Sequence, residues 1–314
     1  MLITIIFALL PIIFTILLGM LGAKNKHFSD QDANKLTKLI LSYALPLSVF
    51  AGIWGTPRKI IIEDIPLAVW LIVSLFVCYI LVLFFCKIIL KQETKVSVLR
   101  ALSIADPSVP FIGSAILPLL FSESISAIDI GICSLIINII LLPIAFALLD
   151  NVGNRKSIKK TQSFSINRRF IDTLKKPLVF SALLGFILSL VGLPMPTKLD
   201  STFTVLGKAA GGLAMFTTGI ILYFRKIHIT RIVSKIVFIR NIILPGLVWI
   251  IMTLTSSPLN LRKIVILTLA IPTATMPTSL AIKYKTNESE IASIQLGSTA
   301  FAFVTLSFFM YLVN

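Results

Sequence analysis

Two short stretches of this sequence place helix-breaking and hydrogen-bonding residues inside apolar runs. Ile104 to Gly113 reads I-A-D-P-S-V-P-F-I-G, and Ile271 to Pro277 reads I-P-T-A-T-M-P. Proline lacks an N–H and clashes with the preceding helical turn, so each proline pair releases carbonyls from the helical ladder. In lipid, such groups are tolerated only against protein or a water-filled cavity. We therefore expect two interrupted helices that cross and bind a small ligand, the alternative being ordinary proline kinks.

The candidate substrate-binding residues are those at the two breaks and one mid-span amide: Asp106, Pro107, Ser108, Pro110, Asn138, Pro272, Thr273, Thr275 and Pro277. The half-helices that begin after Asp106 and near Thr275 would point positive partial charge at the crossing, which favours an anion. Asn138 lies in I-I-N-I-I, where its amide needs a partner. We expect it to hydrogen-bond a neighbouring break, the alternative being a contact that holds two helices together.

Asp106 is the only acidic residue that we place in the interior of a span, and such a carboxyl group is a functional candidate by default. Three roles are open. It carries a coupling proton or a cation, it binds a positive group of the substrate, or it caps the second half-helix with Pro107 at the first helical position.

The composition is that of an integral membrane protein. The 314 residues are 57% hydrophobic and 13% charged, and the mean hydropathy is +0.99. About 20 apolar residues span the hydrocarbon core as a helix. On that scale we predict an all-α protein with ten transmembrane helices, at about 2–23, 36–55, 66–87, 97–121, 127–149, 177–193, 203–224, 236–254, 263–282 and 291–313.

The basic residues are distributed unevenly about these spans. Connectors after odd-numbered spans, with the adjoining helix ends, hold 23 of the 29 Lys and Arg, Arg100 and Lys176 among them. The positive-inside rule then predicts a multi-pass protein of the cell membrane with both termini outside. Arg240 fits a side chain that snorkels to the cytoplasmic surface. A nucleic-acid or lipid surface in the basic loop 150–176 is the alternative to a topology signal, and we expect no nucleic-acid partner.

Five spans precede that basic loop and five follow it, so the two halves enter the membrane in opposite orientations. This predicts an inverted repeat: a first five-helix repeat at 1–149, a cytoplasmic linker at 150–176 and a second repeat at 177–314. Gly207, Gly211 and Gly212 allow close approach, and we expect them to face a neighbouring helix or a second protomer.

No enzyme, metal or cofactor motif stands out. The three cysteines lie in apolar segments without paired spacing, the two histidines lie far apart, and neither H-E-x-x-H nor G-x-S-x-G occurs. We expect no catalytic residue, no metal site and no cofactor.

The chain resembles the auxin efflux carrier family, in its bacterial branch of malate- and malonate-type permeases. The segments that carry the resemblance are L-R-A-L-S-I-A-D-P-S-V-P-F-I-G-S-A-I-L-P, I-I-N-I-I-L-L-P and I-P-T-A-T-M-P-T-S-L-A-I-K-Y-K-T-N-E-S-E-I-A-S. The resemblance implies that helices 1, 2, 6 and 7 form a dimerising scaffold, while helices 3–5 and 8–10 move as an elevator that carries the crossing. Many relatives have asparagine where this chain has Asp106-Pro107, which leaves the coupling ion and the substrate charge open.

The expected function is therefore secondary transport of a small organic anion, such as malate or another carboxylate, by alternating access. Without a nucleotide-binding motif, the driving force is the substrate gradient, the membrane potential or protons, with Asp106 as the coupling candidate. The expected partners are the anion, a proton, the lipid bilayer and a second copy in a homodimer. The alternatives are a sodium-coupled symporter of similar architecture and a membrane sensor that binds without transporting.

Overall fold

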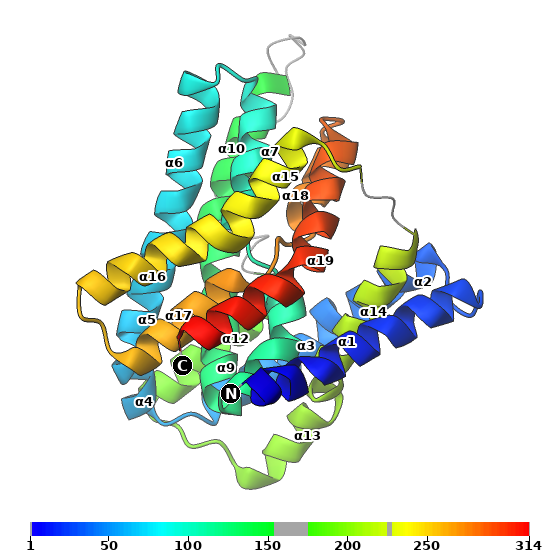
Figure 1. Cartoon of the computed structure of the whole chain (residues 1–314). Coiled ribbons are helices and arrows are strands. Elements are labelled where there is room, and N and C mark those ends of the chain that lie inside the picture. The colour runs from blue at the N-terminus through cyan, green and yellow to red at the C-terminus, as the bar shows by residue number, and fades with distance from the viewer. Residues whose placement is uncertain (1, 154–174, 225–227, 314) are drawn as a thin grey trace, which may run out of the picture.

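A computed structural model describes residues 2–153, 175–224 and 228–313, and within these ranges every regular element is a helix (Figure 1). Helical residues fill most of each of the ten predicted ranges. Six helical runs are long and apolar enough to cross a membrane: Asp30–Trp54, Arg58–Ile89, Glu123–Leu149, Val205–Phe224, Arg231–Leu254 and Glu288–Leu312. Shorter apolar helices cover Ile13–Lys24, Val109–Leu120 and Pro177–Val191. Most of the basic loop, 154–174, lies outside the described residues, as does any binding surface on it.

The elements of the first half, with η marking a π-helical turn, are α1 (Leu2–Lys24), α2 (Asp30–Leu39), η1 (Ile40–Ala44), α3 (Leu45–Trp54), α4 (Arg58–Glu63), α5 (Ile65–Ile72), η2 (Val73–Val77), α6 (Cys78–Phe84), η3 (Phe85–Ile89), α7 (Thr94–Ala105), η4 (Val109–Gly113), α8 (Ser114–Leu120), α9 (Glu123–Leu135), η5 (Ile136–Leu141) and α10 (Leu142–Gly153). Those of the second half are α12 (Pro177–Val191), α13 (Thr197–Gly207), α14 (Ala209–Phe224), α15 (Arg231–Phe238), η7 (Ile239–Ile243), α16 (Leu244–Leu254), α17 (Leu259–Ala270), α18 (Met276–Lys283) and α19 (Glu288–Leu312).

Local sequence explains where some of these helices begin and where π-helical turns interrupt them. α2 begins with a capping box, in which the Ser29 hydroxyl accepts from the N–H of Asp32 and the Asp32 carboxylate accepts from the N–H of Ser29. Pro143 and Pro245 each lie just after a π-helical turn, η5 and η7 respectively. A proline supplies no N–H to the preceding turn, and π-helical turns and bends concentrate where that ladder is interrupted.

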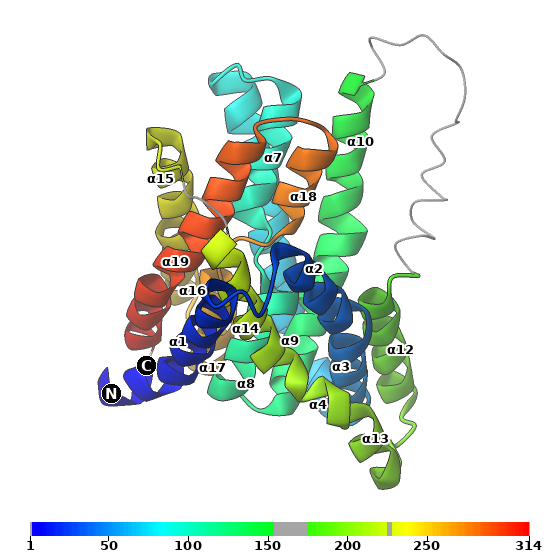
Figure 2. The ribbon, with the colours of Figure 1, turned by 90° about the vertical axis from the view of Figure 1, so that its right-hand side faces the viewer.

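The helices pack in two groups. α1 and α2 lie against α14, while α12 and α13 lie against α3 (Figure 2). A second group contains α5 to α7, α9, α10 and α15 to α19, in which α7 packs against α6, α10 and α18. The two groups meet where α3 and α12 contact α9, and where α14 contacts α8 and η4. The core of buried aliphatic side chains runs through both groups.

Glycines bring three pairs of helices into backbone contact. A Cβ added at Gly219 of α14 would lie 2.0 Å from the Ile16 carbonyl oxygen of α1, and one at Gly207 would lie 2.8 Å from Ser48 Cβ. A Cβ at Gly211 would lie 2.9 Å from the backbone of α8. Gly207 and Gly211 therefore face neighbouring helices, as predicted. A Cβ at Gly212 meets nothing within 4 Å.

We expect Gly219→Ala to lower the thermal unfolding temperature of the purified protein in detergent, because the new methyl group would force α1 and α14 apart. Overpacking of this kind costs roughly 1–3 kcal/mol. Gly212→Ala is the matched control on the same helix, and it should unfold at or slightly above the wild-type temperature since alanine favours a helix. Equal unfolding temperatures for the two variants would contradict this packing.

Candidate substrate site at the crossing of two broken helices

Both predicted interruptions are present, and they pair with each other. α7 ends at Ala105 before η4, and α17 ends at Ala270 before α18. Between them the two chains form an isolated antiparallel bridge of Pro107 with Thr273. The Ser108 N–H donates to the Pro272 carbonyl at 2.8 Å, and the Ala274 N–H donates to the Asp106 carbonyl at 2.9 Å. Each break thus supplies main-chain partners that the other lacks.

The half-helices run in opposite directions through this crossing. Figure 2 shows α7 and α18 at one end of the molecule and α8 and α17 at the other. The second half of the first broken helix begins with η4, where the Ser108 carbonyl accepts the N–H groups of Phe111, Ile112 and Gly113. The other second half, α18, begins after Thr275. The starts of both second half-helices therefore lie beside the crossing.

Of the three roles left open for Asp106, the capping role is wrong. Its own N–H still donates to Leu102, so Asp106 ends α7, and Pro107 is extended instead of opening the next helix. A residue that precedes proline disfavours the helical conformation, so α7 does not continue past Asp106. Asp106 therefore closes the first half-helix and does not cap the start of the second. The Asp106 side chain is buried, and its Oδ2 has no hydrogen-bond partner among the described residues.

A cavity of about 280 Å³ lies beside the crossing. It is lined by six of the predicted site residues, which are Asp106, Pro107, Ser108, Pro110, Asn138 and Thr275. Pro272, Thr273 and Pro277 do not line it. Thr273 is buried and holds the break in place, since its hydroxyl donates to Ser103 O at 2.8 Å and its N–H donates to Ser298 Oγ at 3.1 Å. Pro277 is buried in the first turn of α18.

Lys176 brings a positive charge to this cavity. Its Nζ donates to Asn138 Oδ1 at 2.9 Å, and Asn138 Nδ2 donates to Ser134 O of its own helix at 2.9 Å. The prediction that Asn138 bonds a neighbouring break is therefore wrong, because the lysine satisfies its oxygen. Burial lowers the pKa of Lys176, and the nearby Asp106 raises it in opposition. The sequence offered one signal for Lys176: it immediately precedes Pro177, the first residue of an apolar helix.

Arg240 lies behind the crossing, and its expected role as a snorkelling side chain is wrong. It is fully buried. Its Nη1 donates to Leu269 O at 2.9 Å, and its Nη2 donates to Ile271 O. These carbonyls flank the C-terminal end of α17, where the break has removed their helical partners and where the helix dipole favours a cation. Arg240 thus neutralises the end of one half-helix.

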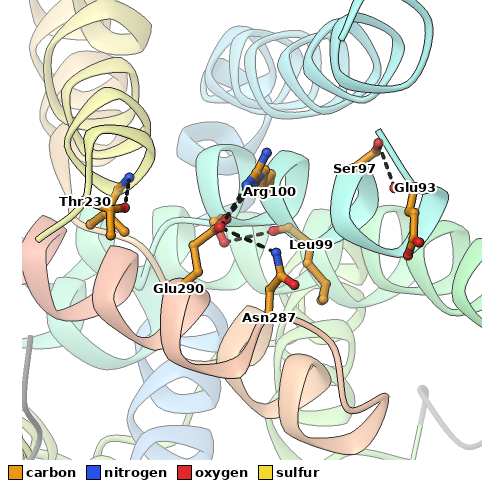
Figure 3. Close-up of polar contacts among 9 residues, drawn as sticks. Glu93, Ser97, Leu99, Arg100, Thr230, Asn287 and Glu290 are labelled. Atoms are coloured by element: carbon orange, nitrogen blue, oxygen red, sulfur yellow. Dashed lines mark hydrogen bonds and ion pairs between the residues drawn. The ribbon is translucent and has the colours of Figure 1, made fainter. Parts of the chain in front are cut away.

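A second cation, Arg100, ties the first broken helix to α19 (Figure 3). Its Nε and Nη2 donate to the two oxygens of Glu290 at 2.7 and 2.8 Å, and both side chains are mostly buried. Asn287 Nδ2 also approaches Glu290 at 3.4 Å. Such a bidentate pair fixes orientation as well as charge. Arg100 therefore has a structural partner in addition to its part in the predicted charge asymmetry.

Asp106 is not the only acid in the interior of a span. α9 begins at Glu123, several residues before the predicted start at 127, so Asp129 lies well inside the helix and is fully buried. No cluster of three or more His, Cys, Asp or Glu side chains that could hold a metal ion occurs in the described ranges.

Long apolar helices together with two that break and cross are found in membrane transporters. The chain belongs to the membrane transport protein family of the auxin efflux carriers, whose family model matches residues 4–310. It is 32% identical over 238 residues to the uncharacterised transporter YfdV of Escherichia coli K12, a match that covers 76% of this chain and 74% of that protein. The YfdV proteins of Escherichia coli O157:H7 and Shigella flexneri match to the same extent.

We expect Arg240→Met to destabilise the protein strongly, because the carbonyls of Leu269 and Ile271 would lose their donors in the core. A buried group without its partner costs roughly 1–3 kcal/mol. The measurement is thermal unfolding in detergent, with Lys235→Met, an exposed lysine of α15, as the control. Wild-type unfolding of Arg240→Met would show that this arginine does not hold the break.

Proposed function

We propose that this protein is a secondary transporter of a small organic anion, such as malate or another carboxylate, that works by alternating access. The observation that carries the proposal is the cavity at the crossing, which is lined by Lys176, Ser108 and Thr275. The substrate gradient, the membrane potential or protons drive the movement.

The charges around the crossing favour a carboxylate. Lys176 offers an ammonium group at the cavity surface, and a hydrogen bond from a charged donor is worth about 1.5–3 kcal/mol. The start of α18 at Thr275 and Met276 adds positive partial charge, and buried Arg240 adds a fixed positive charge behind the break. The unpaired Oδ2 of Asp106 is available to a proton shared with the substrate, which keeps Asp106 as a coupling candidate.

A second cavity supports alternating access. It has a volume of about 350 Å³ and is lined by residues of α1, α3, α8, α9 and α14, including Ser48, Ser114, Ser126 and Gly211. Because α8 lies on the opposite side of the crossing from α18 (Figure 2), the two cavities approach the broken helices from opposite ends. Both also border α3 or the η1 turn before it.

We also propose the following architecture. Ten transmembrane helices form an inverted repeat of 1–149 and 177–314 joined by the cytoplasmic linker 150–176. Helices 1, 2, 6 and 7 are the scaffold, which forms a homodimer, and helices 3–5 and 8–10 carry the crossing as an elevator. The protein lies in the cell membrane with both termini outside, as the excess of Lys and Arg on the other side favours.

The sodium-coupled alternative is disfavoured by Arg240. In sodium-coupled transporters, unwound carbonyls and the C-terminal ends of half-helices coordinate the ion. Here the guanidinium group already binds the Leu269 and Ile271 carbonyls. The Arg240 guanidinium group therefore occupies the carbonyls at the end of α17 that a sodium ion would coordinate.

We expect the protein in proteoliposomes to accumulate radiolabelled malate equally well in sodium and in choline buffers. Lys176→Gln should weaken malate binding roughly 10-fold or more, as expected for loss of a charge-assisted hydrogen bond. Lys175→Gln is the matched control, since this exposed neighbour does not line the cavity. Absence of carboxylate uptake would refute the transport function, uptake that requires sodium would favour the symporter, and binding without uptake would favour the sensor.

A further inference from the structure

Asp129 is a buried acid that the proposed substrate site does not use. It lies in α9, is fully buried, and its Oδ2 is 2.6 Å from Thr268 Oγ1 of α17. Cys133 Sγ, a weak donor, is 4.0 Å from its other oxygen. An isolated carboxylate with so few donors is costly inside a membrane protein, and such acids mark ion or proton pathways.

Counting hydrogens indicates which form this geometry fits. Thr268 Oγ1 is also 2.7 Å from the Ile264 carbonyl, which can only accept. The hydroxyl has a single hydrogen. If Thr268 gives it to Ile264, the short contact with Asp129 needs a hydrogen from Asp129, which must then be a neutral acid. If Asp129 is ionised, Thr268 donates its hydrogen to the carboxylate. The Thr268 Oγ1 and the Ile264 carbonyl oxygen then face each other at 2.7 Å without a hydrogen between them. The neutral form satisfies both contacts.

The surroundings of Asp129 also favour the neutral form. α3, α8 and α12, which pack against α9, have no acidic or basic residue within their bounds. The charged groups on the other neighbouring elements are Asp64, just before α5, and Arg262 and Lys263, near the start of α17. On α9 itself the near titratable group is the Cys133 thiol. Arg240 donates to the carbonyls of Leu269 and Ile271 at the end of α17.

α3 covers Asp129 through contacts that a sliding motion would change. A Cβ at Gly52 of α3 would lie 2.3 Å from Ala127 Cβ, and one at Gly131 would lie 2.6 Å from Ile53 Cδ1. These contacts flank Asp129 along α9. One turn away, Ser126 lines the 350 Å³ cavity, and its buried Oγ has no partner among the described residues. A small shift of α9 against α3 would therefore open a polar path from that cavity to Asp129.

We propose that Asp129 is a proton-binding site of the transport cycle, with Ser126 and the adjoining cavity as the proton's route. This inference rests on the proposed transport function. Asp129 is neutral while α3 covers it, and it releases its proton to the cavity when α9 moves relative to α3. In the ionised state Thr268 turns its hydrogen to Asp129 and releases Ile264. The protonation state of Asp129 thereby changes the hydrogen bond between Asp129 of α9 and Thr268 of α17, the helix that ends at the crossing.

The test compares malate uptake into proteoliposomes with and without an inward proton gradient. The wild-type protein should take up malate faster with the gradient. Asp129→Asn, which keeps a neutral side chain with a donor, should retain malate binding and malate exchange but lose at least 80% of that acceleration. Glu288→Gln, an exposed acid of α19, is the control and should respond as the wild type does.

Several outcomes separate this inference from the proposed function. If the wild type neither binds nor moves malate, the transport function itself fails. If the wild type exchanges malate without responding to the gradient, or if Asp129→Asn responds fully, the proton site is refuted. Loss of the response in Asp106→Asn alone would also refute it and would assign the proton to Asp106.

A second pair of variants keeps the inference testable if Asp129→Asn does not fold. Thr268→Val removes the hydroxyl that is the partner of the Asp129 carboxyl group in both protonation states, so it should move the pH profile of malate uptake by roughly 0.5–1 pH unit. Thr268→Ser keeps the hydroxyl and should leave the profile in place. Identical profiles for the two variants would overturn the role of Asp129.

Discussion

The structure depends on one exchange of hydrogen bonds, made where two broken helices cross. Ser108 donates to Pro272 and Ala274 donates to Asp106, so two extended segments satisfy each other in the middle of an apolar bundle. Neither break is tolerable alone, because an unpaired backbone group in a low-dielectric interior costs several kcal/mol. The pairing also fixes the polarity of the site, since it places the starts of both second half-helices beside one cavity.

The remaining unsatisfied ends are neutralised by charges from outside the breaks. Arg240 binds the carbonyls at the end of α17, and Lys176 lies at the cavity and donates to Asn138. Arg100 and Glu290 connect α7 to α19, so the first broken helix is held at its middle as well as at its break. A broken helix end thus fixes the position of Arg240, while Asn138 and Glu290 fix the positions of Lys176 and Arg100.

The sequence was sufficient to predict what depends on local chemistry, and it failed where the partner is distant. Proline pairs within apolar runs located both interruptions, and six of nine candidate residues line the cavity. The sequence predicts Lys176 and Arg240 at the membrane surface, because a charge near the end of a span gives no sign of a distant partner. Lys176 bonds Asn138, 38 residues away, and Arg240 bonds Leu269, 29 residues away. Asp129 was missed because α9 begins earlier than its apolar run does. The capping role of Asp106 failed because Pro107 adopted an extended conformation to pair with Thr273.

The central claim is that the carboxylate binds in the cavity beside the paired breaks. Ser42 of η1 lines that cavity, and Ser48 of α3 lines the second one. The direct measurement is the rate at which a charged thiol reagent labels Ser42→Cys and Ser48→Cys, with the native cysteines replaced, in the presence and absence of malate. The account predicts that malate slows labelling at position 42 and leaves position 48 little changed. Protection at position 48 alone would contradict it.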